Sequence, residues 1–173
     1  RPFAKPTDLY EFLKEDFDNL VGSAQIFSFP EIRIKAEQIA RRKVLDCKRY
    51  EDITLQDIYR EISNITGLSE ISLNKILEKE KELEIKFSQP RKKIKEIFDL
   101  ALFCQKHIIC ITDMYLSKND IKRILDKNGY QNIERIFVSS EAHLSKGTGN
   151  LYTFVLKELG IKASDILHIG DNW

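Results

Sequence analysis

The chain has 173 residues, enough for one ordinary domain or for a compact α/β core with a small helical insert, but not for two independent large domains. Hydrophobic residues make up 42% of the chain and charged residues 32%, which indicates a folded protein with a solvated surface and argues against disorder. With 28 basic and 27 acidic side chains, the net charge of +1 is too small to favour binding to nucleic acid or to an anionic membrane.

Neither targeting nor disulfide signals occur in the sequence. It has no run of about 18 apolar residues, and its opening segment lacks the apolar stretch of a signal peptide, so membrane insertion is not expected. Cys47, Cys104 and Cys110 have neither Cys-x-x-Cys nor Cys/His ligand spacing, which indicates neither a disulfide framework nor a zinc site. We therefore expect a protein of the reducing cytoplasm.

Residues 1–88 show helical periodicity and almost no strand signals. Apolar spacing predicts one helix to about residue 19, a second after Pro30, a third that ends before Gly67, and a fourth to about residue 86. Thr54 and Asp57 resemble a capping box at the start of the third helix. The mixed charges of residues 78–84 predict a solvated face. We expect this half to form a helical cap domain.

Residues 89–173 alternate between helices and short apolar strands, which is typical of a parallel α/β sheet. The predicted strands cover residues 108–112, 135–138 and 165–169, and the predicted helices cover residues 91–106, 118–128 and 149–159. The seven glycines are too dispersed for a Walker-type loop, which disfavours P-loop nucleotide chemistry. The expected fold is α/β, with a three-layer α/β/α core behind the N-terminal helical cap.

Polar residues follow each predicted strand, where ligands bind in an open parallel sheet. Thr112 and Asp113 end the first strand, and Lys146 lies in Ser-Lys-Gly-Thr-Gly after the second, just before a helix. Asp171 follows a glycine at the end of the third strand. A hydroxyl, a lysine and an aspartate at one edge predict a site for a phosphate and a Mg²⁺ ion.

Each of these residues also has an ordinary structural interpretation. Thr112 suits a strand simply because it is β-branched, and Lys146 and Asp171 suit a solvated surface. Asp113 has the side chain of a helix N-cap. The three histidines lack mutual ligand spacing, so none is predicted to bind a metal. The order of the polar residues, each in strand context, favours the functional interpretation.

This ordered set resembles the second, third and fourth motifs of the haloacid dehalogenase (HAD) superfamily. The resemblance covers residues 90–173 by motif and the first half by architecture, because some members insert a helical cap of the C1 type after the first motif. Within the superfamily, residues 1–9 and 32–37 resemble a bacterial subgroup associated with glycosyltransferases of surface-polysaccharide biosynthesis. The resemblance implies a Rossmannoid parallel sheet of the HAD type.

The resemblance also implies roles for the predicted site residues. Thr112 would bind the transferred phosphoryl group, assisted by Asp113 at the phosphate. Lys146 would bridge the phosphate and the nucleophile, and Asp171 would help to hold Mg²⁺ as the metal ligand. Thr112, Lys146 and Asp171 are thus the predicted catalytic residues.

The family's nucleophile, the first aspartate of an Asp-x-Asp pair after the first strand, has no counterpart in this sequence. Asp16 and Asp18 have the right spacing but lie in helix-forming surroundings without a preceding apolar strand. By family order the pair would lie just before Arg1, and a further acidic residue would lie beyond Trp173. We therefore expect a truncated core that lacks its first strand, and no catalysis by this chain alone.

Two classes of function fit these expectations. The first is part of a Mg²⁺-dependent HAD-like hydrolase, a phosphatase that acts on a small phosphorylated metabolite such as a sugar phosphate through an aspartyl-phosphate intermediate. The alternative is a non-catalytic binding or scaffolding module within a larger glycosyltransferase-type protein. A phosphomutase or a dehalogenase would suit the same fold.

Overall fold

The computed structural model describes residues 5–22, 27–47 and 49–170. These residues are mostly helical, with 65% of the structure in helices and 5% in strands. The first half contains, in chain order, η1 (Pro6–Leu13), α1 (Lys14–Val21), α2 (Phe29–Cys47), α3 (Leu55–Thr66) and α4 (Glu70–Phe87). The second half contains α5 (Lys92–Phe103), β1 (Ile109–Thr112), α6 (Lys118–Lys127), β2 (Arg135–Val138), α7 (Ser139–Ala142), α8 (Asn150–Leu159) and η3 (Ala163–Asp165).

The capping box at the start of α3 is confirmed. Thr54 Oγ1 accepts a hydrogen bond from Asp57 N at 3.1 Å, and Asp57 Oδ2 accepts one from Thr54 N at 2.9 Å. These bonds satisfy backbone N–H groups that have no partner within the helix. α3 ends at Thr66 and is followed by its C-cap, Gly67. The φ of Gly67, 73°, lies in the left-handed region that glycine adopts without a steric penalty.

The charged stretch of α4 is not entirely solvated, contrary to the prediction. Glu80 is fully buried and Glu84 is 5% exposed. Arg33 of α2 is also fully buried, and its Nη2 lies 2.7 Å from Glu80 Oε1. Tyr59 Oη of α3 donates to Glu80 Oε2 at 2.8 Å. Arg33 and Glu80 face one another between helices, so each supplies hydrogen bonds that the other loses on leaving water.

β1 and β2 form a parallel pair, with Ile109 opposite Arg135 and Thr112 opposite Val138. Ser117 caps α6, since its Oγ accepts from Asp120 N at 3.2 Å, and α6 begins at Lys118, the predicted start of this helix. Because the strands are parallel, their carboxyl ends lie at the same edge of the pair. Residues that follow Thr112 and Val138 therefore lie near one another.

The predicted three-layer α/β/α sheet, a Rossmannoid core of the HAD type, is wrong for the residues that the structure describes. They form one two-stranded sheet, and residues 165–169 are not a strand. Asp165 ends η3, and residues 166–170 pair with no other strand, with Leu167 82% and Ile169 44% exposed. A strand forms where a neighbouring strand satisfies its N–H and C=O groups, and among the described residues this segment forms no such ladder with β1 or β2.

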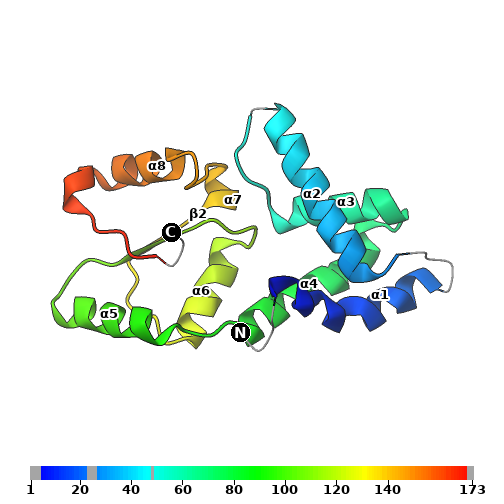
Figure 1. Cartoon of the computed structure of the whole chain (residues 1–173), viewed down its shortest axis with the longest axis horizontal. Coiled ribbons are helices and arrows are strands. Elements are labelled where there is room, and N and C mark those ends of the chain that lie inside the picture. Colours follow the sequence, from blue (N-terminus) through cyan, green and yellow to red (C-terminus); the bar gives the residue numbers. More distant parts are fainter. Residues whose placement is uncertain (1–4, 23–26, 48, 171–173) are drawn as a thin grey trace.

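One hydrophobic core connects the two halves. It consists mainly of side chains from η1 and α1–α4, and Leu116, Ile121 and Val138 of the second half join it. Figure 1 shows α1–α4 gathered on one side, with α6 next to α4 and with α5, α8 and the strands on the other side. α5 lies at the periphery, and Leu100 and Phe103 are 60% and 86% exposed.

The helices in the described part of the chain do not combine the length and the apolar character that crossing a membrane requires.

Candidate functional site

The site begins at the carboxyl ends of the two strands. Thr112 is the last residue of β1 and pairs with Val138, the last residue of β2. Its side chain is half-buried, and its hydroxyl makes no hydrogen bond with any residue that the structure describes. Thr112 therefore has a donor available for a ligand at this edge.

The loop that carries Lys146 reaches the same edge. We call residues 145–149 the Lys146 loop. The loop precedes α8 and ends at Gly149, whose φ of 83° lies in the left-handed region. Lys146 N donates to Asp113 Oδ1 at 3.0 Å and to Asp113 Oδ2 at 3.2 Å. Asp113, the residue after β1, and Lys146 of the loop, 33 positions apart, thus lie in direct contact.

The side chain of Lys146 lies close to β1. Burial raises the pKa of the Cys110 thiol in β1 to about 11, and the Lys146 ammonium acts in the opposite direction. Among the described residues, the Lys146 ammonium has no hydrogen-bond acceptor and no carboxylate partner. The described residues thus provide no counter-ion for this cation near β1, the strand whose last residue is Thr112.

Asp113 holds the loop and adds negative charge to one flank of the site. Its carboxylate accepts both hydrogen bonds from Lys146 N, and burial and Asp113 together raise the pKa of Tyr152 in α8. Tyr152 Oη lies 3.3 Å from His168 Nε2, and the two rings meet edge to face. An anion would be repelled on this flank and attracted toward Lys146. A direct phosphate contact of Asp113 stays a prediction.

Asp171, the predicted metal ligand, lies outside the described residues. Within the described ranges, no group of three His, Cys, Asp or Glu residues is arranged to hold a metal ion. Asp113, which contacts the loop, already accepts a backbone hydrogen bond with each oxygen. The described residues therefore do not assemble a Mg²⁺ site, which needs several oxygen ligands.

Two acidic residues of the helical half reach this edge, and no sequence motif identified them. Asp52 lies 7% exposed between α2 and α3 and accepts from Arg41 Nη1 at 2.8 Å and from Ser139 Oγ. Ser139 Oγ in turn accepts from Met114 N at 2.9 Å. Glu51 contacts the Lys146 loop itself, as described below. A lone acidic residue in a loop carries no periodicity or spacing, so the chain fold alone reveals these contacts.

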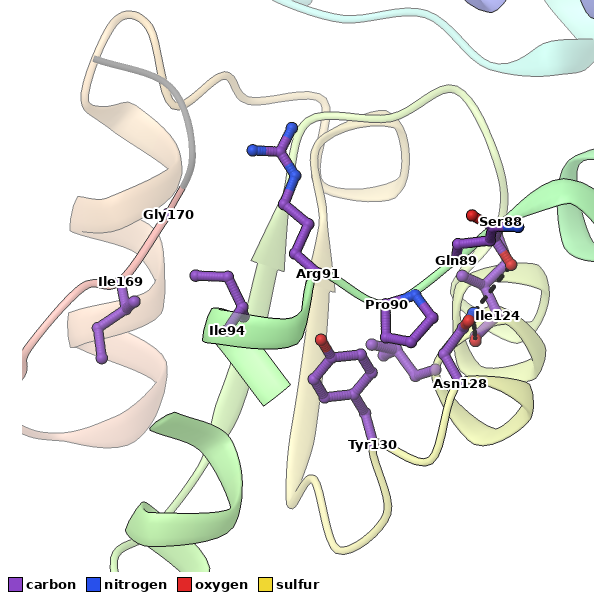
Figure 2. Close-up of a pocket in the computed structure, with 11 residues that line it drawn as sticks. Ser88, Gln89, Pro90, Arg91, Ile94, Ile124, Asn128, Tyr130, Ile169 and Gly170 are labelled. Atoms are coloured by element: carbon purple, nitrogen blue, oxygen red, sulfur yellow. Dashed lines mark hydrogen bonds between the residues drawn. The ribbon is translucent and has the colours of Figure 1, made fainter. Parts of the chain in front are cut away.

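A cavity of about 260 Å³ lies elsewhere, and its wall is mostly apolar. Figure 2 shows it between the segment that enters α5, the end of α6 with Tyr130, and Ile169 and Gly170 near the end of the chain. Neither Thr112 nor Lys146 lines it. The cavity is therefore separate from the polar edge at the strand ends.

The strand edge combines a free hydroxyl, a cation and a loop held in a defined conformation. A hydroxyl and an ammonium can bind and orient the oxygens of a phosphoryl group. No Asp-x-Asp follows a strand within the described ranges, so the edge provides no aspartyl nucleophile of that pattern. The chain matches no protein-family model and no curated protein. Its function is inferred from this geometry and from the sequence motifs.

Proposed function

We propose that this chain is the phosphate-binding part of a Mg²⁺-dependent phosphohydrolase of the haloacid dehalogenase type. The proposed substrate is a small phosphorylated metabolite, such as a sugar phosphate. The observation that carries the proposal is the contact of Lys146 N with Asp113, directly after Thr112. It brings the second and third motifs of the resemblance to one edge, which supports a shared phosphate site.

In the proposed reaction, Thr112 Oγ1 donates to one phosphoryl oxygen and the Lys146 ammonium pairs with another. These contacts orient the phosphorus and offset the charge of the transferred group, which is most of what a protein contributes to phosphoryl transfer. The P–O bond to the alcohol breaks as an aspartate carboxylate attacks, and water then releases inorganic phosphate from the acyl phosphate. That aspartate is not among the described residues, and Mg²⁺ is assigned to Asp171.

The alternative is a non-catalytic module that binds a phosphorylated ligand within a larger glycosyltransferase-type protein. The lack of a nucleophile at the described strand ends favours it. Both proposals place the protein in the cytoplasm, where free cysteines are stable, and Cys47, Cys104 and Cys110 are free. Both also require phosphate binding at Lys146, and they differ in whether phosphate is released.

Titration with inorganic phosphate, followed by NMR, tests the shared requirement. We expect Lys146→Ala to weaken binding by at least about tenfold, because a hydrogen bond to a charged group contributes roughly 1.5–3 kcal/mol. Lys157→Ala, an exposed lysine of α8, is the matched control and should bind phosphate as the wild type does. A wild-type chain without affinity for phosphate would overturn both proposals.

Phosphate release from a panel of sugar phosphates separates the two proposals when it is assayed with a protein that also contains the proposed aspartate nucleophile. Release that requires Mg²⁺, disappears with EDTA and is lost in Lys146→Ala supports the phosphohydrolase. Binding without release supports the non-catalytic module.

A further inference from the structure

Glu51 lies in the connection between α2 and α3, yet its carboxylate bonds with the other half of the chain. Glu51 Oε2 accepts from Ser145 N at 2.8 Å and from Thr148 Oγ1 at 2.7 Å, and Glu51 Oε1 accepts from Asn150 Nδ2. Its own amide donates to His143 O at 3.1 Å. The Glu51 side chain thus bonds with Ser145 and Thr148 of the Lys146 loop and with Asn150, the residue that follows the loop.

The bonds of Glu51 complement those of Asp113. Glu51 accepts from the amide of Ser145, and Asp113 accepts from the next amide, that of Lys146. Two consecutive N–H groups are therefore held by carboxylates from opposite halves of the chain. Both amides are therefore occupied and are not available to an anion, whereas the Lys146 ammonium has no partner among the described residues. Its position depends on both carboxylates.

The internal bonds of the loop leave its position undetermined. Gly147 N donates to Ser145 Oγ at 3.0 Å, and Gly149 N donates to Lys146 O at 3.0 Å. These bonds close the loop on itself but do not fix it against the strands. Hydrogen bonds to residues outside the loop are needed to fix its position. The Glu51 carboxylate accepts from three donors, and its charge strengthens each bond.

We infer that Glu51 is a positioning residue that holds the Lys146 loop against the carboxyl end of β1, and so fixes where the Lys146 ammonium can meet an anion. Its effect on phosphate rests on the proposed function, but its effect on the loop does not. The helical half thereby takes part in building the phosphate site, although its own residues do not touch the ligand.

Glu51→Gln tests this inference in the full chain, because it removes the charge and turns one acceptor atom into a donor. Glu141→Gln is the matched control: Glu141 Oε1 also accepts a backbone hydrogen bond, from Lys118 N at 2.6 Å, but at the start of α6. Two quantities are measured, amide hydrogen exchange in the Lys146 loop and affinity for inorganic phosphate. We expect Glu51→Gln to speed exchange of the Ser145 amide about tenfold and to weaken phosphate binding about tenfold.

A second variant, Thr148→Val, removes one donor from the opposite side of the contact. If Glu51 acts through this loop, the effects of Glu51→Gln and Thr148→Val on exchange and on phosphate affinity will be smaller together than their sum. A purely structural role would lower thermal stability without that non-additivity. The inference is overturned if exchange in the loop is unchanged in Glu51→Gln, or if exchange rises while phosphate affinity stays at the wild-type value.

Failure of the proposed function gives a different result. If the wild-type chain binds no phosphate, the proposed function falls, while the exchange measurement still decides whether Glu51 holds the loop.

Discussion

Arg33 is a guanidinium without access to water, and three kinds of contact surround it. It pairs with Glu80, its Nη1 lies 2.9 Å from Glu37 Oε2, and its Cζ lies 4.8 Å and 5.1 Å from the ring centroids of Tyr10 and Tyr115. Burial by itself lowers the pKa of Arg33, but its partners, Glu80 first among them, together raise it by more. The pKa of Arg33 therefore lies above its ordinary value, and the group stays charged. A buried charge is tolerated only with such a complete set of partners.

We expect Arg33→Met to destabilise the protein by roughly 3–5 kcal/mol, because Glu80 would be left buried without its counter-charge. The free energy of unfolding from urea denaturation measures this loss. Arg42→Met, an exposed position on the same helix, should change it by less than about 0.5 kcal/mol. Equal losses in the two variants would mean that the pair contributes nothing specific.

The sequence allowed part of this cluster to be predicted. Arg33 and Glu37 are four positions apart on one helix, a spacing at which opposite charges meet, and they form an ion pair. The Glu80 contact joins residues 47 positions apart, and a charged run gives no indication of which members face another helix. Thr112, Asp113 and Lys146 were identified from their strand context, and the Asp113–Lys146 contact agrees with it. Glu51 carries no comparable signal.

Among the secondary-structure elements, helices with local capping signals were predicted best. The α3 capping box depends on two residues three positions apart, so the sequence contains all of it. The segment 165–169 is as apolar as the other strands, but strand formation depends on a distant partner that local sequence does not specify. Periodicity therefore predicted β1 and β2 and failed for the third strand.

We expect Thr54→Ala to lower the free energy of unfolding by about 1 kcal/mol, the usual loss for an N-cap hydroxyl. Ser69→Ala at the start of α4 removes an equivalent cap, since Ser69 Oγ accepts from Ser72 N at 3.1 Å, and should cost a similar amount. Chemical denaturation of both variants checks this. A Thr54→Ala protein as stable as the wild type would show that tertiary packing alone fixes the start of α3.

The same cap gives stability a pH dependence. Burial raises the pKa of Asp57, but hydrogen bonds from Thr54 and the nearby Arg60 outweigh it and hold the pKa below its ordinary value of 3.8. A carboxyl with a depressed folded pKa stabilises the fold above its unfolded pKa, and this contribution is lost as the pH falls through the folded value. The loss in Thr54→Ala should therefore shrink in acid, below the ordinary pKa of aspartate.

The molecule as a whole carries an uneven surface. In the described part of the chain, α5 and the segment after η3 expose large apolar side chains: Ile97, Leu100, Phe103, Leu167 and Ile169. Apolar groups gathered on one region favour association, whereas single exposed ones do not.

We expect the chain to self-associate with increasing concentration, and Leu100→Glu together with Phe103→Glu to reduce this association. Both side chains are more than half exposed, so the substitutions should leave the melting temperature close to the wild-type value. Sedimentation velocity at several concentrations measures the effect. Ile71→Glu, at an 89% exposed position on α4, is the control; if it reduces association equally, the α5 region is not responsible.

The hydroxyl of Ser139 has a consequence for how this protein can evolve. It donates to Asp52 and accepts from Met114 N at once, in a site with no exposure to solvent. Alanine at position 139 would leave both an amide and a carboxylate oxygen without a partner, whereas threonine would keep both bonds at the cost of fitting an extra methyl group. Positions 52 and 139 should therefore change together over descent, so that a lineage losing the hydroxyl also loses the carboxylate.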